Sequence, residues 1–504
     1  MPINIRLLSF LVSISILFII NVNGQSTVPF NEIPLSDKVK IEDVVVTGNK
    51  HTQESIILRE VTLRKGDIIQ KANLTELMEK SLENILKTSL FHTATIDQQR
   101  IKLSSDSAVN LTSGTDSSAR KEFRDNKDST GESGIECISV VINVTERWYW
   151  WIWPMLEHPD RNFNDWAQHK DIARLSGGVY FQHENMFGKM EKLNIRLLGG
   201  YRTYIAANYE WPYINKNKTI GIGLLGSYYT QHEVNYATVN NKQLYYDGKQ
   251  FMLTSYNLAV YTRFRPGIHF THLFTIQHNA ANFNDSINIL NPFFNLQTKQ
   301  LQLLSFSYLM KVDFRDNRNY PLKGYYMEAE ASHLKNISSS FSRQSMRISL
   351  RGYLPLGKHL YTASEFVSKI TSPKIKPYPL QNALGFDRDF VRGYEYQVIE
   401  APHYWIFKSH LRYAIIPDLK IRLPLIRSEK FNPVPLSAYA GIHYDMGKSF
   451  PALNPQTNSL QGKLLTGYGV GIDFVTFYDK VVRVEYTFRH KGQGGLFINF
   501  MAMI

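Results

Sequence analysis

From residue 150 to the C-terminus the chain repeats one pattern, a short run in which apolar and polar residues alternate. Runs of this kind, bounded by Gly, Asn, Asp or Pro, predict half-buried β-strands. Together with a short aromatic run they number about sixteen. The predicted strands are Trp150–Leu156, Arg174–Gln182, Lys192–Gly199, Tyr201–Trp211, Ile220–Thr230, Phe251–Phe264, Ile268–His278, Leu301–Val312, Tyr325–Leu334, Arg343–Leu354, Leu360–Val367, Tyr404–Ile415, Pro435–Tyr444, Leu464–Phe474, Val481–His490 and Leu496–Met503.

The segment before these strands has a different pattern, which predicts an α+β domain over residues 39–147. Its elements follow the order β-α-α-β-β, and the turn after the first strand contains Gly48 and Asn49, where Gly48 is expected to have a positive φ. Thr52 is predicted to cap the first helix. The elements are Ile41–Val46, a helix over Gln53–Glu60, a helix over about Asn73–Ser89, Thr93–Leu103 and Cys137–Thr145. Residues 104–134, rich in Ser, Asp and Lys, are predicted to be a mobile insertion.

The N-terminus predicts an exported protein. Arg6 precedes an apolar run, Leu7–Ile20, and Gly24 offers a small residue for cleavage. We interpret residues 1–24 as a signal peptide, followed by a linker over residues 25–38. A retained anchor helix is the alternative. The residue after the cut is Gln25, not cysteine, so a lipoprotein anchor is not indicated.

The composition limits the classes of exported protein to which the chain can belong. The mature part has no apolar run long enough for a transmembrane helix, yet the chain contains 29 tyrosines and 29 phenylalanines. An exported chain of alternating strands is either a soluble secreted β-protein or an outer-membrane barrel. A burst of indoles at Trp148–Trp153 is typical of a membrane–water interface, although an aromatic core strand is the alternative. An even strand count favours a barrel over residues 148–504.

One connection within this region has unusual chemistry. The segment between Leu360–Val367 and Tyr404–Ile415 is long and polar, but it contains the apolar and aromatic residues of GFDRDFVRGY, from Gly385 to Tyr394. A loop that folds back into a cavity buries such rings and pairs its arginine there. With the first strand leaving the periplasm, this connection lies on the outer side. The long segments Gln231–Lys249 and Asn279–Lys299 lie on that side as well.

A second candidate motif is a charged turn. Pro321 and Gly324 are suited to a tight turn, and charges precede them. The residues of this motif are Asp313, Arg315, Asp316, Pro321 and Gly324.

These motifs resemble those of a known family. The N-terminal pattern V-x-x-G-N-x-x-T is similar to that of a POTRA domain, a periplasmic module of outer-membrane assembly proteins. The turn resembles the D-x-R-D-x-x-x-x-P-x-x-G turn of the BamA/TamA superfamily, also known as the bacterial surface antigen family. Val391, Arg392, Gly393 and Tyr394 resemble its VRGF/Y loop. Further similarities are Tyr444–Gly447, with F-x-D-x-G, and the Gly-rich strand Gly467–Asp473.

The resemblance implies a fold and a site. It implies one POTRA domain followed by a transmembrane barrel whose arginine loop enters the lumen. There the arginine meets an acidic residue of the inner wall, for which Asp473 and Glu485 are the candidates and Asp473 is favoured. Two features depart from the best-studied insertases: the single POTRA domain, and a C-terminus, Phe500–Ile504, that lacks a terminal aromatic residue.

Enzymatic chemistry has little support in the sequence. There is no G-x-S-x-G elbow, no H-E-x-x-H and no metal-ligand spacing of histidine and cysteine. Asp387 and Asp389 are interpreted as members of a salt-bridged loop. The net charge of +13 is scattered along an exported chain, which argues against nucleic acid. No cofactor is implied.

Three functions remain after these exclusions. The leading one is a barrel that assists insertion, assembly or translocation of other proteins, with polypeptide clients captured by strand pairing. Its partners would include outer-membrane lipids and periplasmic chaperones or lipoproteins. The second is a passive pore or surface antigen whose POTRA domain serves its own biogenesis. The third, a membrane-embedded hydrolase, is disfavoured by the absent motifs.

Overall fold

The computed structural model describes residues 37–100, 135–157, 172–291, 294, 300–373, 377–386, 389–422, 424, 434–450, 458–476, 480–489 and 492–500. The predicted signal peptide and the predicted insertion lie outside the described residues. In the part of the chain that is described, none of the helices has the length and apolarity needed to cross a membrane.

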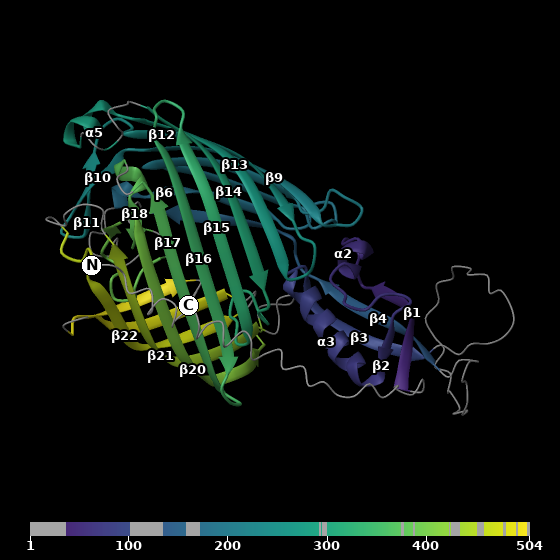
Figure 1. The fold of residues 1–504 in the computed structure, drawn as a ribbon. Coiled ribbons are helices and arrows are strands. Elements are labelled where there is room, and N and C mark those ends of the chain that lie inside the picture. The colour runs from purple at the N-terminus through teal and green to yellow at the C-terminus, as the bar shows by residue number, and fades with distance from the viewer. Residues whose placement is uncertain are drawn as a thin grey trace. The chain divides into compact units, whose positions relative to one another are not determined.

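The N-terminal domain is a four-stranded sheet with two helices (Figure 1). Its strands run in the order β2-β1-β4-β3. Alternating apolar residues of β1 and β4 supply the core, where Ile41, Val140 and Ile142 are fully buried. The elements are β1 (Lys38–Thr47), α2 (Glu54–Leu58), β2 (Ile68–Gln70), α3 (Lys71–Lys87), β3 (Phe91–Arg100) and β4 (Glu136–Glu146).

Two details of this domain differ from the sequence prediction. The first helix is only Glu54–Leu58, and its N-cap is Gln53, whose side chain makes no capping hydrogen bond, so the prediction of a Thr52 cap is wrong. The three-residue strand β2 was not predicted. It pairs antiparallel with the start of β1, Lys38 facing Gln70, and it is too short to show a period.

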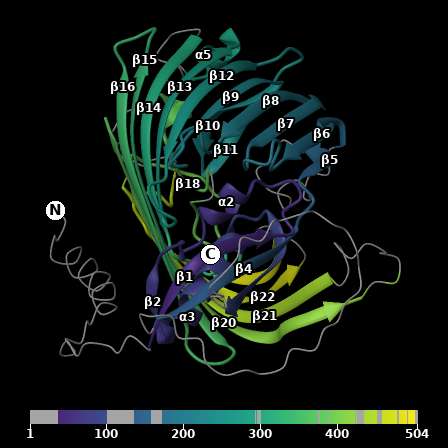
Figure 2. The same cartoon turned by 90° about the vertical axis from the view of Figure 1, so that its right-hand side faces the viewer.

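The C-terminal region is a single antiparallel sheet of sixteen strands, as the alternating runs predict. Each strand pairs with the next in the chain, and the sheet curves back on itself (Figures 1 and 2). The strands are β5 (Trp150–Glu157), β6 (Ser176–His183), β7 (Lys192–Gly200), β8 (Arg202–Trp211), β9 (Ile220–Gln231), β12 (Leu253–Phe264), β13 (Phe270–Phe283), β14 (Gln300–Asp313), β15 (Gly324–Asn336), β16 (Ser342–Pro355), β17 (Leu360–Ser372), β20 (His403–Ile421), β21 (Val434–Phe450), β22 (Leu464–Thr476), β23 (Lys480–Arg489) and β24 (Gly494–Phe500).

The two faces of this sheet have opposite chemistry. In β12 the side chains of Tyr256, Leu258 and Val260 are exposed on the outer face, while the residues between them point inward. On the inner face of the later strands, Asp445, Asp473 and other charged residues are buried. An apolar exterior and a polar interior are the arrangement of a membrane-spanning barrel.

The connections on one side of the sheet are long and carry structure of their own. A hairpin, β10 (Glu233–Val239) and β11 (Lys242–Asp247), lies between β9 and β12, and its turn residues Asn240 and Asn241 have positive φ. Helix α5 (Asp285–Leu290) follows β13. Val234 of the hairpin packs with Ile287 of α5 in a buried apolar cluster. The connection between β17 and β20, on the same side, contains η3 (Tyr378–Leu380), β18 (Asn382–Leu384) and β19 (Ile399–Glu400).

Candidate functional site

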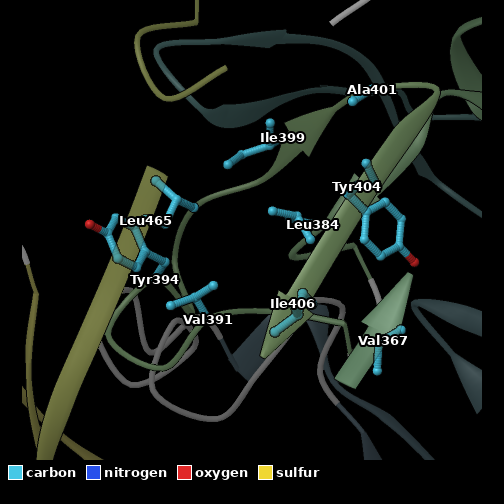
Figure 3. Close-up of a cluster of buried hydrophobic side chains, with 10 residues drawn as sticks. Val367, Leu384, Val391, Tyr394, Ile399, Ala401, Tyr404, Ile406 and Leu465 are labelled. Atoms are coloured by element: carbon cyan, nitrogen blue, oxygen red, sulfur yellow. The ribbon is translucent and has the colours of Figure 1, made fainter. Parts of the chain in front are cut away.

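The segment Asp389–Tyr394 of the β17–β20 connection is packed against the inner wall. Val391 and Tyr394 belong to a buried apolar cluster that also contains Ile406 of β20 and Leu465 of β22 (Figure 3). This burial accounts for the apolar residues in an otherwise polar connection. The loop therefore folds inward, as its composition predicts.

Asp389 anchors the start of this segment. Its carboxylate accepts two hydrogen bonds from the guanidinium of Arg347 on β16, from Nε at 3.0 Å and Nη2 at 2.8 Å. It accepts a third from the hydroxyl of Tyr404, at 2.5 Å. Asp389 thus belongs to a salt-bridged loop, as expected. Asp387 lies outside the described residues.

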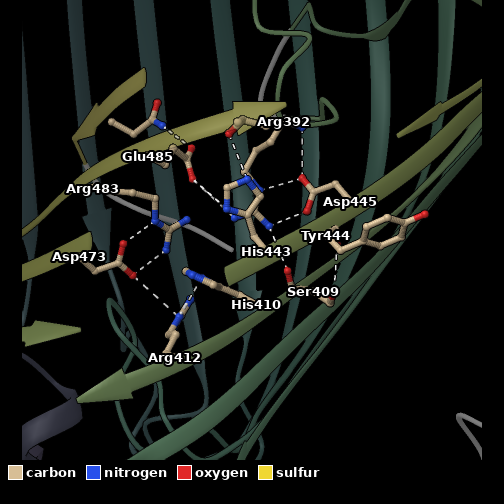
Figure 4. Close-up of polar contacts among 12 residues, drawn as sticks. Arg392, Ser409, His410, Arg412, His443, Tyr444, Asp445, Asp473, Arg483 and Glu485 are labelled. Atoms are coloured by element: carbon tan, nitrogen blue, oxygen red, sulfur yellow. Dashed lines mark hydrogen bonds and ion pairs between the residues drawn. The ribbon is translucent and has the colours of Figure 1, made fainter. Parts of the chain in front are cut away.

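Arg392 pairs with Asp445 of β21, and this pair is the centre of the site (Figure 4). The guanidinium donates from Nε to Oδ2 at 2.8 Å and from Nη2 to Oδ1 at 2.5 Å, in a bidentate arrangement. The backbone N–H of Arg392 also donates to Oδ2, at 3.2 Å. Arg392 is 2% exposed and Asp445 is fully buried, so each charge depends on the other.

Glu485 of β23 supplies a second acid to the same arginine. Its Oε2 lies 3.6 Å from Nη1 of Arg392. Its Oε1 accepts a hydrogen bond from the side-chain amide of Asn499 on β24, at 2.9 Å. His443, from β21, reaches the hydroxyl of Thr487 at 3.0 Å. The arginine thus sits between acids from β21 and β23, and one of these acids contacts the last strand.

Asp473, the favoured partner in the sequence analysis, does not pair with Arg392, so that preference is wrong. It accepts hydrogen bonds from Arg483 at 2.6 and 2.9 Å and from the hydroxyl of Tyr320 at 2.8 Å. Arg412 lies 3.8 Å away. Asp473 is six positions along β22 from Gly467, the residue that touches the arginine loop, which is about 20 Å at strand spacing. It is therefore out of reach.

Glycines of the wall make room for the loop. A Cβ on Gly467 would lie 1.9 Å from the backbone oxygen of Arg392, and one on Gly447 would lie 2.8 Å from Val391. Gly393 itself has a φ of +89°, a conformation that glycine adopts without strain. The Gly-rich strand of the sequence motif is thus the surface on which the loop rests.

The charged turn forms the connection between β14 and β15. Asp313 and Arg315 make a bidentate pair at 2.8 Å, and Asp316 accepts hydrogen bonds from the backbone N–H groups of Asn317 and Leu322. Gly324 has a φ of +100°, and a Cβ there would lie 2.0 Å from the oxygen of Phe314. Pro321 is buried in the same turn. The motif therefore stabilises the turn that carries Tyr320 to Asp473.

The turn of the N-terminal domain also contains a glycine with a positive φ that is packed against the backbone. Gly48 has a φ of +84°, as expected, and a Cβ there would lie 2.0 Å from the backbone oxygen of Val144. The side-chain amide of Asn49 donates to the backbone oxygen of Thr52 at 3.0 Å. Both residues therefore shape the turn itself.

Glu395 follows the motif, in the connection before β19, and is a half-buried acid whose carboxylate oxygens are buried. Burial raises its pKa to about 8, and the nearby charges of Glu485 and Asp445 act in the same direction. Glu395 is therefore mostly protonated at neutral pH, which avoids a third negative charge beside the two wall acids.

The arrangement pairs buried charges of the loop with buried charges of the wall. Among the described residues, no cluster of His, Cys, Asp or Glu is suited to hold a metal ion. Of the acids facing the loop, Asp445 was missed as the partner, although it lies in the Tyr444–Gly447 motif that the sequence analysis noted. That motif is the sequence feature that could have indicated Asp445 as the partner of Arg392, because an aspartate on an inward-facing strand position needs a cation.

Comparisons with known proteins agree with this architecture. The model of the Omp85 superfamily domain matches residues 185–476, and a POTRA model, described as the surface antigen variable number repeat, matches residues 39–147. No curated protein is similar enough in sequence to count as a match.

Among solved structures, the chain is similar to BamA from Haemophilus ducreyi lacking POTRA domains 1–3, with 13% identity and a TM-score of 0.46, over 92% of this chain and 83% of that one. It is similar to CdiB from Acinetobacter baumannii, with 10% identity and a TM-score of 0.46, over 92% and 74%. For CdiB from Escherichia coli the identity is 10% and the TM-score 0.45, over 94% and 91%. The superfamily model covers more than half of the chain, so the protein belongs to the Omp85 superfamily of outer-membrane β-barrels that take part in the insertion or secretion of proteins.

Proposed function

We propose that this protein assists the insertion, assembly or translocation of other polypeptides at the outer membrane, with its POTRA domain in the periplasm and without an enzymatic step. Membership of the Omp85 superfamily supports the general role. The client is an unfolded or exported polypeptide, which is recognised through its backbone. Strand pairing is the chemistry suited to this task, because every polypeptide offers the same N–H and C=O groups.

The observation that carries the proposal is the pair of strand edges at the ends of the sheet. Within the described residues, the hydrogen-bonded order runs from β5 to β24, and no ladder joins these two strands. Both are short, and Pro154 removes a hydrogen-bond donor from β5. Each strand therefore has backbone groups that an incoming client strand can pair with.

The arginine loop is connected to one of these edges. The ring of Tyr396 lies 5.9 Å from that of Phe497 on β24. Asn499 of the same strand donates to Glu485, which also faces Arg392. In this proposal the loop holds β24 in place from inside, so that its free edge is presented as an ordered strand.

The POTRA domain offers a further edge. β3 is the outermost strand on one side of the four-stranded sheet, and it pairs only with β4 in the described part of the domain. This strand, β3, therefore has an outer edge at which a client or a periplasmic chaperone can pair.

Site-specific photo-crosslinking tests the proposal. A photoreactive phenylalanine analogue at Ile498 of β24 or Ile152 of β5 is expected to capture other outer-membrane proteins during their synthesis. The matched control is Val470 of β22, which is equally outward-facing but flanked by paired strands on both sides. Depletion of the protein should lower the amounts of the captured clients in the outer membrane.

Two results would count against the proposal. Equal capture at all three positions would mean that the edges have no special role. An outer-membrane proteome that is unchanged after depletion would favour the alternative, a passive pore or surface antigen whose POTRA domain serves its own biogenesis.

A further inference from the structure

The outer face of β13–β17 contains a groove of about 600 Å³ that the proposed function does not use. Its position on the outer face follows from the strand register, because Phe274, Tyr308, Ala331, Met346 and Ile370 form one continuous cross-strand row. Phe274, Met346 and Ile370 in that row are 52%, 50% and 57% exposed. The groove therefore faces the membrane.

The groove has apolar walls. Phe306 and Tyr308 of β14 form one side, and Met346 of β16 and Ile370 of β17 form the other. Ala331 of β15 lies between them, and its small side chain leaves the space open. A groove with this lining is matched by a hydrocarbon chain.

One end of the groove is polar, and a lysine lies just beyond it. On β15, β16 and β17 the next row consists of His333, Gln344 and Ser372, which also line the groove, and the row continues on β14 with Phe306. Beyond it, on the same face of β15, Lys335 is exposed. This end leads into the connection after β15, on the same side of the sheet as the arginine loop, which is the outer side in the proposed orientation.

We propose that this groove binds a phosphate-bearing lipid of the outer leaflet. One acyl chain lies between the Phe306–Tyr308 and Met346–Ile370 walls, and a phosphate of the head group lies at Lys335. Hydrogen bonds from His333 and Gln344 hold the polar part below the phosphate. The amphiphilic order of the groove, apolar and then polar and then cationic, is the order of groups along such a lipid.

Native mass spectrometry of the full-length protein, delipidated in detergent, tests the proposal. The probes are lipid A, a phosphorylated acyl-glucosamine lipid, and the same lipid with its phosphates removed. The wild-type protein is expected to retain lipid A in a one-to-one complex. Ala331→Trp, whose indole fills the groove, should remove most of this binding. Ala207→Trp is the matched control, since Ala207 is an exposed strand residue of β8 outside the groove.

The head-group contact is tested separately. Lys335→Glu is expected to weaken the binding of lipid A about fivefold and to leave the dephosphorylated lipid unaffected, because one cationic side chain near an anionic lipid has an effect of this size. If Ala331→Trp does not fold, as judged by the heat-dependent shift in gel mobility, Ala331→Leu replaces it. Equal lipid A binding by the groove variant and Ala207→Trp would overturn the proposal. Equal binding of the two lipids by the wild-type protein would also overturn it.

Discussion

Arg392 is a buried cation whose charge is balanced mainly by Asp445, so its removal should be costly. We predict that Arg392→Ala destabilises the folded barrel by about 3–5 kcal/mol, because Asp445 is left buried without its partner. Arg392→Lys should recover little, since an ammonium cannot form the bidentate contact. The measurement is the temperature at which the folded barrel loses its compact gel mobility in detergent.

A charge exchange identifies the partner. Arg392→Asp combined with Asp445→Arg should restore part of the lost heat resistance, whereas Arg392→Asp combined with Asp473→Arg should not. Asp473 serves as the matched control because it is an equally buried acid of the same wall. Heat resistance that is unchanged in Arg392→Ala would mean that the loop is an ordinary outer loop.

Glu395 should make the barrel less stable at high pH. Its pKa in the folded protein, about 8, lies above the ordinary value of 4.5, so the folded state binds more protons than the unfolded state between these values. Stability is therefore highest below pH 4.5 as far as this group is concerned, and it is lost as pH rises through 8. Glu395→Gln should flatten this dependence and raise heat resistance at pH 9 relative to the wild-type protein. Parallel pH profiles for the two proteins would contradict the assignment.

For the site, the sequence could predict only the face of the sheet on which each side chain lies. Arg392, Asp473 and Glu485 were all expected inside, and all three are buried there. The alternation of side chains along a strand determines which face a residue occupies. The position of the residue along the barrel axis depends on strand register and on where the loop contacts the wall. Asp445 is paired with Gly467 in the ladder, at the same position along the barrel axis as the loop. No pattern in a single sequence indicates that position.

At the scale of elements, the glycines of β22 determine whether the loop can dock. Gly467→Ala should displace the loop, because the new methyl group would overlap the backbone oxygen of Arg392, which cannot rotate away. We expect lower heat resistance and faster cleavage of the loop by added protease. Gly177→Ala in β6 is the matched control, since no atom lies within 4 Å of its added Cβ. Equal effects of the two substitutions would show that the loop does not depend on this contact.

The strands of the barrel were predictable because each has one face toward lipid and one toward the interior. Apolar and polar residues therefore alternate along the whole length of each strand. The hairpin of β10 and β11 shows where this signal was not used. Its strands alternate on either side of Asn240-Asn241, a dipeptide suited to positive φ, yet the sequence analysis gives the segment only as a long outer connection. The segment β2 is too short for any period to appear.

At the scale of the whole molecule, two of the polar clusters on the inner wall involve residues from different connections. Arg392 comes from the long β17–β20 connection, and Tyr320 comes from the β14–β15 turn on the other side of the sheet. Arg392 contacts Asp445 on β21 and Glu485 on β23, and Tyr320 contacts Asp473 on β22. The two sequence motifs thus stabilise the adjacent strands β21, β22 and β23 from opposite sides of the sheet.

The N-terminal domain, residues 39–147, should fold without the barrel. Its apolar strand residues Ile41, Val140 and Ile142 are fully buried, as are Ile57 of α2 and Ile85 of α3, so the sheet and both helices each bury apolar side chains. Expressed alone, the domain should unfold cooperatively in urea. It should also tolerate deletion of residues 104–134, whose polar sequence has too few apolar residues to contribute to that core. The comparison is between the domain with and without this segment, followed by circular dichroism. Similar midpoints are expected, because the strands on either side of the deletion, β3 and β4, are already neighbours in the sheet. A domain that is unfolded in both forms would show that the boundary at residue 147 is misplaced.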